Sequence, residues 1–117
     1  MKKDDVERYD ELLSKLESIR NDVAALSSKK PSDQLNKFKI KYVNDVLTKV
    51  NVLIGDDKPY ADFEIFDEVD LPTNSDALMI INLYINGMKR FKLHNSTNKS
   101  VDLDWTHKER VWNLEDE

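Results

Sequence analysis

Apolar residues recur along the first part of the chain at intervals of 3, 4, 3, 4 and 3 residues. This is the a/d pattern of a heptad repeat, and it indicates one apolar seam along an amphipathic helix. No Gly or Pro interrupts the stretch, and charged side chains occupy the other faces. We therefore predict a helix from about Val6 to Leu26. Its seam consists of Tyr9, Leu12, Leu16, Ile19, Val23 and Leu26.

A second helix is expected after Pro31, whose ring disfavours helical geometry at the residue before it. Apolar residues resume there at intervals of three and four, and Gly55 is a good terminator, so this helix should end near Ile54. The short connector favours an antiparallel helical hairpin over residues 1–54. The expected seam is Leu35, Phe38, Tyr42, Val46, Val50 and Leu53, with Val43, Leu47 and Ile54 beside it.

The hydrophobic pattern changes after the second helix, and residues 60–114 are expected to be mainly β. Partial alternation of apolar and polar residues over 61–71 indicates a strand. Residues 95–100 are polar and predict a loop. Val101, Leu103 and Trp105 alternate with aspartates, which indicates a further strand.

Residues 78–94 allow two interpretations. Asn86-Gly87 between β-rich runs is a strong signal for a two-residue hairpin turn, and a helix would have to accommodate Gly87 at a cost of about 1 kcal/mol. We therefore favour two strands, Leu78–Ile85 and Met88–His94. The alternative is a third helix over 76–94, because apolar residues also recur there at helical spacing.

The end of the chain carries the spacing of a capping box over 106–109. It predicts a short C-terminal helix bearing Val111 and Trp112. Together these elements make an α+β fold, in which an N-terminal antiparallel helical hairpin precedes a small antiparallel β-meander. An all-α fold is the alternative, if 76–94 is helical.

The composition suits one small domain spanning residues 1–117, with 39% hydrophobic and 35% charged residues. The longest apolar run covers only 77–81, and the N-terminus has no apolar segment. We expect no membrane association, no secretory signal, and a cytoplasmic location that does not exclude the nucleus. The net charge of −5 is unevenly spread: residues 51–85 hold one basic and eight acidic side chains, whereas 86–99 hold four basic and none acidic. Such blocks are expected to pair within the fold.

The sequence offers little material for catalysis. It contains no cysteine, two glycines and only the histidines His94 and His107, which excludes thiol chemistry and glycine-rich phosphate loops. Carboxylates at 67–70 and at Asp102 and Asp104 lack the glycine that a calcium loop requires. We therefore expect no enzyme activity, no cofactor and no metal site.

The remaining function classes involve binding. We expect a protein–protein interaction or assembly module, with another protein or a second copy as partner. One alternative is an acidic inhibitor or DNA mimic that acts on a nucleic-acid enzyme through residues 56–76 and the acidic C-terminal tail. Another, weaker one is a nucleic-acid binder using a basic strand over 88–92. The predicted partner-binding residues are Tyr9, Leu12, Leu16, Ile19, Val23, Leu26, Trp105 and Trp112.

Overall fold

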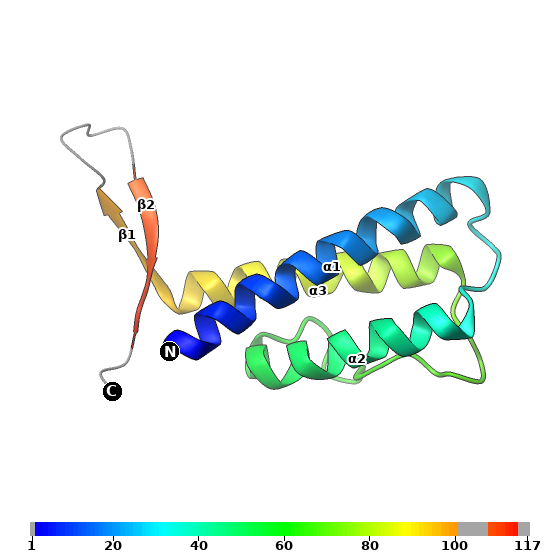
Figure 1. Cartoon of the computed structure of the whole chain (residues 1–117), viewed down its shortest axis with the longest axis horizontal. Coiled ribbons are helices and arrows are strands. Elements are labelled where there is room, and N and C mark those ends of the chain that lie inside the picture. The colour runs from blue at the N-terminus through cyan, green and yellow to red at the C-terminus, as the bar shows by residue number, and fades with distance from the viewer. Residues whose placement is uncertain (1, 101–107, 115–117) are drawn as a thin grey trace.

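The computed structural model describes residues 2–100 and 108–114. Over these residues the chain forms a bundle of three helices with a two-stranded hairpin at one end (Figure 1). The elements are α1 (Lys3–Lys29), α2 (Lys37–Ile54), the short 3-10 turn η1 (Gly55–Asp57), α3 (Asn74–His94), β1 (Ser96–Ser100) and β2 (Lys108–Trp112).

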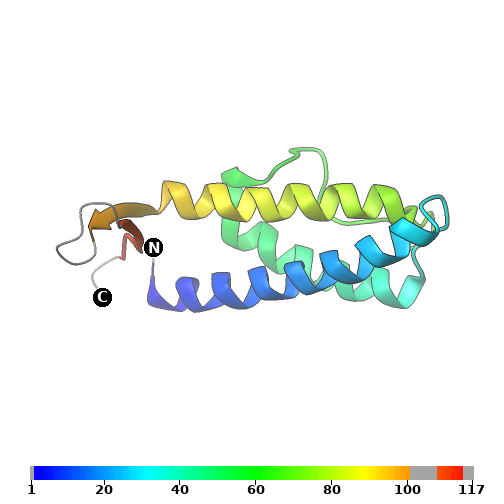
Figure 2. The same cartoon turned by 90° about the horizontal axis from the view of Figure 1, so that it is seen from above.

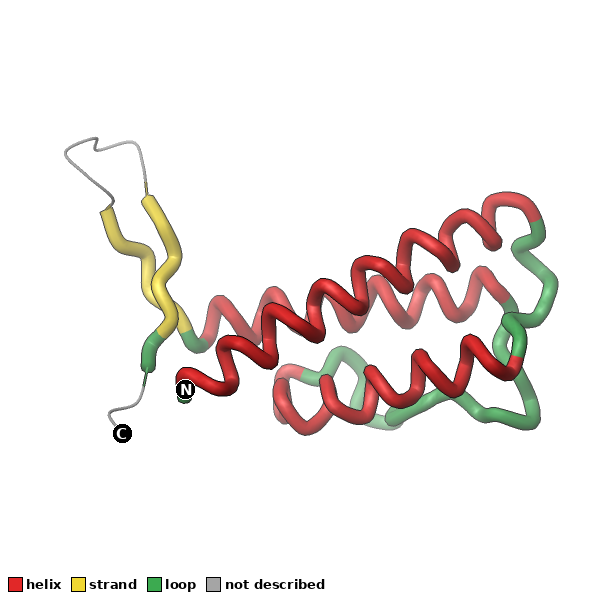
Figure 3. Tube along the Cα trace, in the orientation of Figure 1, coloured by secondary structure: helices red, strands yellow, loops and turns green. Residues whose placement is uncertain are grey.

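The three helices lie side by side along an elongated body of 52 × 31 × 21 Å (Figure 2). α1 leads away from the hairpin end, and α2 and α3 both run back toward it, so the latter two are parallel. The loop over 58–73 returns the chain along α2 to the start of α3 (Figure 3). α1 packs mainly on α3 and secondly on α2, which places the core between the three helices.

α1 and α2 confirm the two predicted helices. The start of α2 and its buried face differ from the prediction. α2 begins at Lys37, because the side-chain Oδ1 of Asn36 accepts a hydrogen bond from the backbone N–H of Lys39 at 2.8 Å. Leu35 lies before the helix and is buried, while its N–H donates to the carbonyl of Pro72 at 2.9 Å. The helix ends at Ile54, and the Gly55 that follows has a φ of +50°, which suits a residue without a side chain.

Residues 78–94 are helical, so the favoured β-hairpin is wrong and the third-helix alternative fits. The helix starts one turn before Leu78, where the Thr73 hydroxyl accepts the N–H of Asp76 at 3.1 Å. Its buried face has the periodicity of a helix, so tertiary packing outweighs the local turn signal of Asn86-Gly87. The buried apolar residues are Ala77, Ile81, Tyr84, Ile85, Met88 and Phe91.

Gly87 has a packing role in this helix. A β-carbon built at this position would lie 3.0 Å from the carbonyl oxygen of Asp57 and 3.3 Å from Cδ of Pro59. The backbone at the end of η1 therefore approaches α3 at the turn where Gly87 leaves no side chain in the way. The glycine that suggested a hairpin instead allows close contact between a helix and a turn.

The predicted strand over 61–71 is also wrong, because this segment is an irregular loop against α2 and α3. Its backbone groups bond to side chains rather than to a neighbouring strand. The Asn44 amide donates to the carbonyl of Phe66 and accepts its N–H, both at 2.8 Å, and Asn51 donates to the carbonyl of Glu64 at 2.8 Å. Phe66 is buried, which anchors the loop to the core.

The C-terminal region forms a hairpin from residues predicted otherwise. The segment expected as a polar loop contains β1, and the segment expected as a short helix contains β2. The strands are antiparallel with Ser96 opposite Trp112. Trp112 packs on the end of the bundle, and this contact favours the extended conformation over the local capping-box signal. The predicted strand around Trp105 lies outside the described residues, and the described part of the chain shows this hairpin rather than a β-meander.

Candidate interaction surface

The predicted seam of α1 faces the inside of the bundle. Five of its residues are at most 6% exposed, and Leu26 is half-buried against the same core. A partner would reach these side chains only if α1 separated from α2 and α3. In the described arrangement the seam holds the chain's own helices together, and its use in association stays a prediction. The five residues are Tyr9, Leu12, Leu16, Ile19 and Val23.

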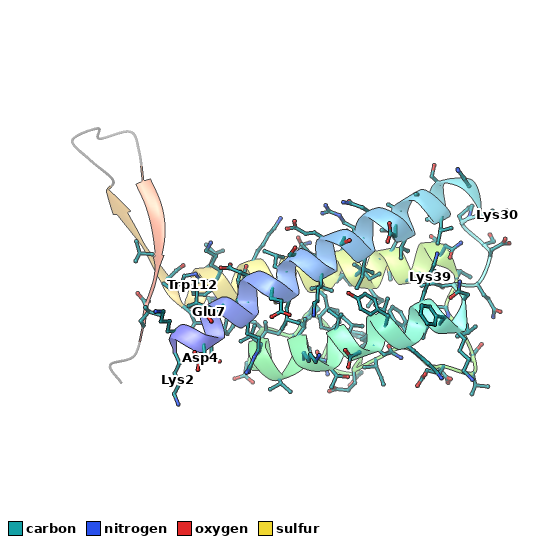
Figure 4. The ribbon with its side chains drawn as sticks, in the orientation of Figure 1. Lys2, Asp4, Glu7, Lys30, Lys39 and Trp112 are labelled. Atoms are coloured by element: carbon teal, nitrogen blue, oxygen red, sulfur yellow. The ribbon has the colours of Figure 1, made fainter. Side chains whose placement is uncertain are left out.

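Trp112 is half-buried at the point where the hairpin meets the helices (Figure 4). Its ring lies edge to face with that of Tyr9, with centroids 4.8 Å apart, and 6.3 Å from that of Phe91. The ammonium of Lys92 lies 5.5 Å from the Trp112 centroid. Trp112 thus attaches β2 to α1 and α3, whereas Trp105 lies outside the described residues.

The outer face of α2 carries a regular exposed row, which we name the α2 stripe. Its members follow each other at intervals of 4, 3, 4 and 3 residues, so they lie on one side of the helix, opposite the core. The apolar members are conspicuous: Phe38 is 83% exposed, Val52 76% and Tyr42 48%. The α2 stripe is Phe38, Tyr42, Asp45, Lys49 and Val52.

Two of these residues correct the predicted seam of the second helix. Phe38 and Tyr42 were expected to face the core, but they face solvent. The core side of α2 instead follows a second apolar series in the same segment, also at intervals of 3 and 4. That series is Ile40, Val43, Leu47, Val50 and Ile54. The excess of apolar residues over one seam was the signal, in the sequence, that α2 has a second apolar face.

Hollows lie on both flanks of the α2 stripe. On the α1 side, one of about 400 Å³ has Leu12 in its lining and another of about 140 Å³ is lined by Ile19 and Val43. Lys39, labelled in Figure 4 near the start of α2, lies at the edge of the smaller hollow. On the loop side, a hollow of about 360 Å³ lies beside Ile65, which is 44% exposed. The stripe is therefore a ridge between two shallow grooves.

Charges in the middle of this surface are paired within the chain. Asp45 and Lys49 form an ion pair at 3.3 Å along α2, and Glu11 and Lys15 form one at 3.1 Å along α1. The hydrogen bond from Lys15 to Glu11 raises the pKa of the lysine, and the charges of Glu11, Tyr42 and Asp45 add to this effect. Both ion pairs therefore lie within a single helix, and Asp45 of α2 adds a weaker attraction for Lys15 of α1.

The basic segment 88–92 lies on α3 rather than on a strand, which corrects the geometry proposed for nucleic-acid contact. Two of its cations already have partners within the chain. Arg90 donates to the backbone carbonyl of Asp57 at 3.3 Å, and Lys92 lies over Trp112. A helix also points successive basic residues in different directions, so they form no continuous strand face.

Two acidic side chains of the segment 56–70 also have partners within the chain. Asp57 lies 2.7 Å from the ring nitrogen Nδ1 of His94, and Lys58 pairs with Glu64. These contacts tie the loop to itself and to α3. Asp57 and His94 join the blocks 51–85 and 86–99, whereas Lys58 and Glu64 lie within one block, so the expected pairing of charge blocks stays a prediction.

Over residues 2–100 and 108–114, no group of three or more His, Cys, Asp or Glu side chains is placed to hold a metal ion. Within the same ranges, none of the helices combines the length and the apolar character that a membrane span requires. The chain matches no protein-family model, no curated protein and no solved structure.

Proposed function

We propose that this chain is a non-catalytic protein–protein interaction module that binds its partner through the α2 stripe. The observation that supports the proposal is the exposed apolar row of Phe38, Tyr42 and Val52 on the side of α2 opposite the core. Isolated exposed apolar residues are common on protein surfaces, but a row at heptad spacing is typical of a helix that packs on another helix.

The surroundings of the stripe support the same function. Aromatic residues supply much of the binding free energy at protein interfaces, and two of the three apolar members are aromatic. The grooves on either side can receive side chains of a helix laid along α2. The seam of α1 is occupied by the core. α3 also exposes Met79, Leu83 and Leu93, but this row has no aromatic member, so we favour the α2 stripe.

A photo-reactive amino acid placed at single positions tests the proposal. We expect a benzoylphenylalanine at Phe38 or Val52 to form protein adducts on irradiation in the native host, and also in the purified protein where the partner is a second copy. The matched control is the same residue at Asn82, which is exposed on α3. Absence of adducts above the Asn82 control, at both α2 positions, would refute the proposal.

A further inference from the structure

The arrangement of charge and apolar surface on α2 indicates what its partner is. The α2 stripe has an aromatic end at Phe38 and Tyr42, an aliphatic end at Val52, and the pair Asp45 and Lys49 between them. Ile65 of the loop lies beside Val52 and widens the aliphatic end. A partner helix that fits this face needs apolar residues at both ends. In its middle it needs a basic residue opposite Asp45 and an acidic residue opposite Lys49.

A second copy of α2, turned to run antiparallel, meets these requirements. In an antiparallel pair of identical helices related by a two-fold axis, the residue numbers of any two facing residues add up to the same value. A sum of 94 places Asp45 opposite Lys49 of the second copy and Tyr42 opposite its Val52. Each contact occurs twice, because the same patch is used by both copies.

We infer that the α2 stripe is the interface of an antiparallel homodimer, in which two α2 helices pack against each other around the paired Asp45 and Lys49. This inference rests on the proposed function, since it names the partner for the same surface. The four charges then alternate in sign around the two-fold axis. A parallel arrangement would place like charges opposite each other, which disfavours it.

The inferred dimer is weak. α2 has 18 residues and is therefore about 27 Å long. One helix face per copy buries an area at or below the roughly 1,200 Å² that marks the lower limit of stable interfaces. We expect a dissociation constant on the order of micromolar to millimolar, so the dimer forms and separates with concentration.

Charge exchange distinguishes a second copy from any other partner. Asp45→Lys or Lys49→Asp alone places like charges along α2 and across the axis, and each should weaken dimerisation roughly tenfold. The double variant Asp45→Lys/Lys49→Asp restores both sets of pairs and should recover the dimer. A different protein with fixed charges would not accept the double variant. Lys89→Asp on α3 has the same change of net charge as Lys49→Asp and should leave dimerisation unchanged.

Sedimentation equilibrium over a wide concentration range measures these effects. We expect the mean mass to rise from 13.7 kDa toward twice that value, with the double variant matching the original chain. Register is checked by mixing Asp45→Cys and Lys49→Cys proteins, because the natural chain has no cysteine. Disulfides should form between the two variants in preference to within each one.

The outcomes separate this inference from the proposed function. A chain that stays at 13.7 kDa up to about 1 mM, or a double variant no better than the single ones, overturns the homodimer. If photo-adducts at Phe38 and Val52 then contain a different protein, the interaction module stands without the homodimer. If no adducts form either, both are refuted.

Discussion

The rings of Tyr9 and Trp112 meet edge to face with their centroids 4.8 Å apart. Tyr9 lies in the second turn of α1 and Trp112 ends β2, so the contact joins the two ends of the described chain. Phe91 of α3 completes the cluster at 6.2 Å from Tyr9. Trp112 therefore helps to fix the hairpin on the bundle.

Removal of this ring should loosen the hairpin and destabilise the bundle. We expect Trp112→Ala to lower the free energy of unfolding by about 2 kcal/mol, less than for a fully buried tryptophan because the ring is half-buried. Urea unfolding followed by far-UV circular dichroism measures the change. Leu114→Ala, which alters an exposed residue of the same tail, is the control and should have no effect. Equal losses in both variants would contradict the anchoring role.

Asn44 should be as important for the loop as Trp112 is for the hairpin. Its amide satisfies both backbone groups of Phe66, and it is buried. Asn44→Ala leaves an N–H and a carbonyl without partners, so we expect a loss of about 2 kcal/mol in the free energy of unfolding. Asn82→Ala on the exposed face of α3 is the matched control. Similar midpoints for both variants in urea would show that the loop is held by other contacts.

The helices α1 and α2 were predictable because their apolar residues keep a period near 3.6 over several turns. Which face of α2 is buried could not be predicted, because two apolar series lie on the same helix. Phe38 and Tyr42 belong to one series and Ile40 and Val43 to the other, and only packing against α1 and α3 decides which is buried. The two aromatic residues of the candidate site, Phe38 and Tyr42, were therefore predicted as part of the core-facing seam.

The β predictions were wrong where residues that locally suggest a strand or a turn instead make contacts with a distant part of the chain. Asn86-Gly87 has the composition of a tight turn, yet Gly87 is the point where the backbone of Asp57 approaches α3. In the segment 61–71 the alternating residues Ile65 and Val69 are exposed and Phe66 is buried instead, while hydrogen bonds with Asn44 replace those of a neighbouring strand. In both segments the deciding partner is far away in sequence, and no local pattern contains it.

Gly87 provides a direct test of this explanation. In an open helix, Gly→Ala stabilises by about 1 kcal/mol, because alanine has the higher helix propensity. At this position the new methyl group would meet the backbone oxygen of Asp57 at 3.0 Å. We therefore expect Gly87→Ala to lower the thermal midpoint.

The neighbouring residue supplies the control for that prediction. Asn86 is exposed on the same helix, so Asn86→Ala should change propensity alone and raise the thermal midpoint slightly. Differential scanning calorimetry compares the two variants. A rise of the thermal midpoint in both variants would show that the contact between the turn and α3 is loose.

Alkaline pH should destabilise the fold through two buried tyrosines. Burial raises the pKa of Tyr9 and of Tyr84 from 10.0 to about 12, because the ionised ring is poorly solvated in the core. Below pH 10 both tyrosines are neutral in the folded and unfolded chain, so they add no pH dependence. Between pH 10 and 12 the unfolded chain releases these protons first, and the free energy of unfolding falls as pH rises, on the order of 1–2 kcal/mol per tyrosine.

Tyr84→Phe separates this effect from the hydrogen bond that the same hydroxyl makes. At pH 8 the variant loses the bond donated to Oδ1 of Asn51 at 2.6 Å, which should cost about 1 kcal/mol. Between pH 10 and 12 it should lose less stability than the original chain, because one titrating group is gone. Urea unfolding at pH 8, 10, 11 and 12 gives both quantities, with Tyr60→Phe as the exposed control. If the free energy of unfolding of Tyr84→Phe falls as steeply with pH as that of the original chain, ionisation of Tyr84 does not limit the alkaline stability of the fold.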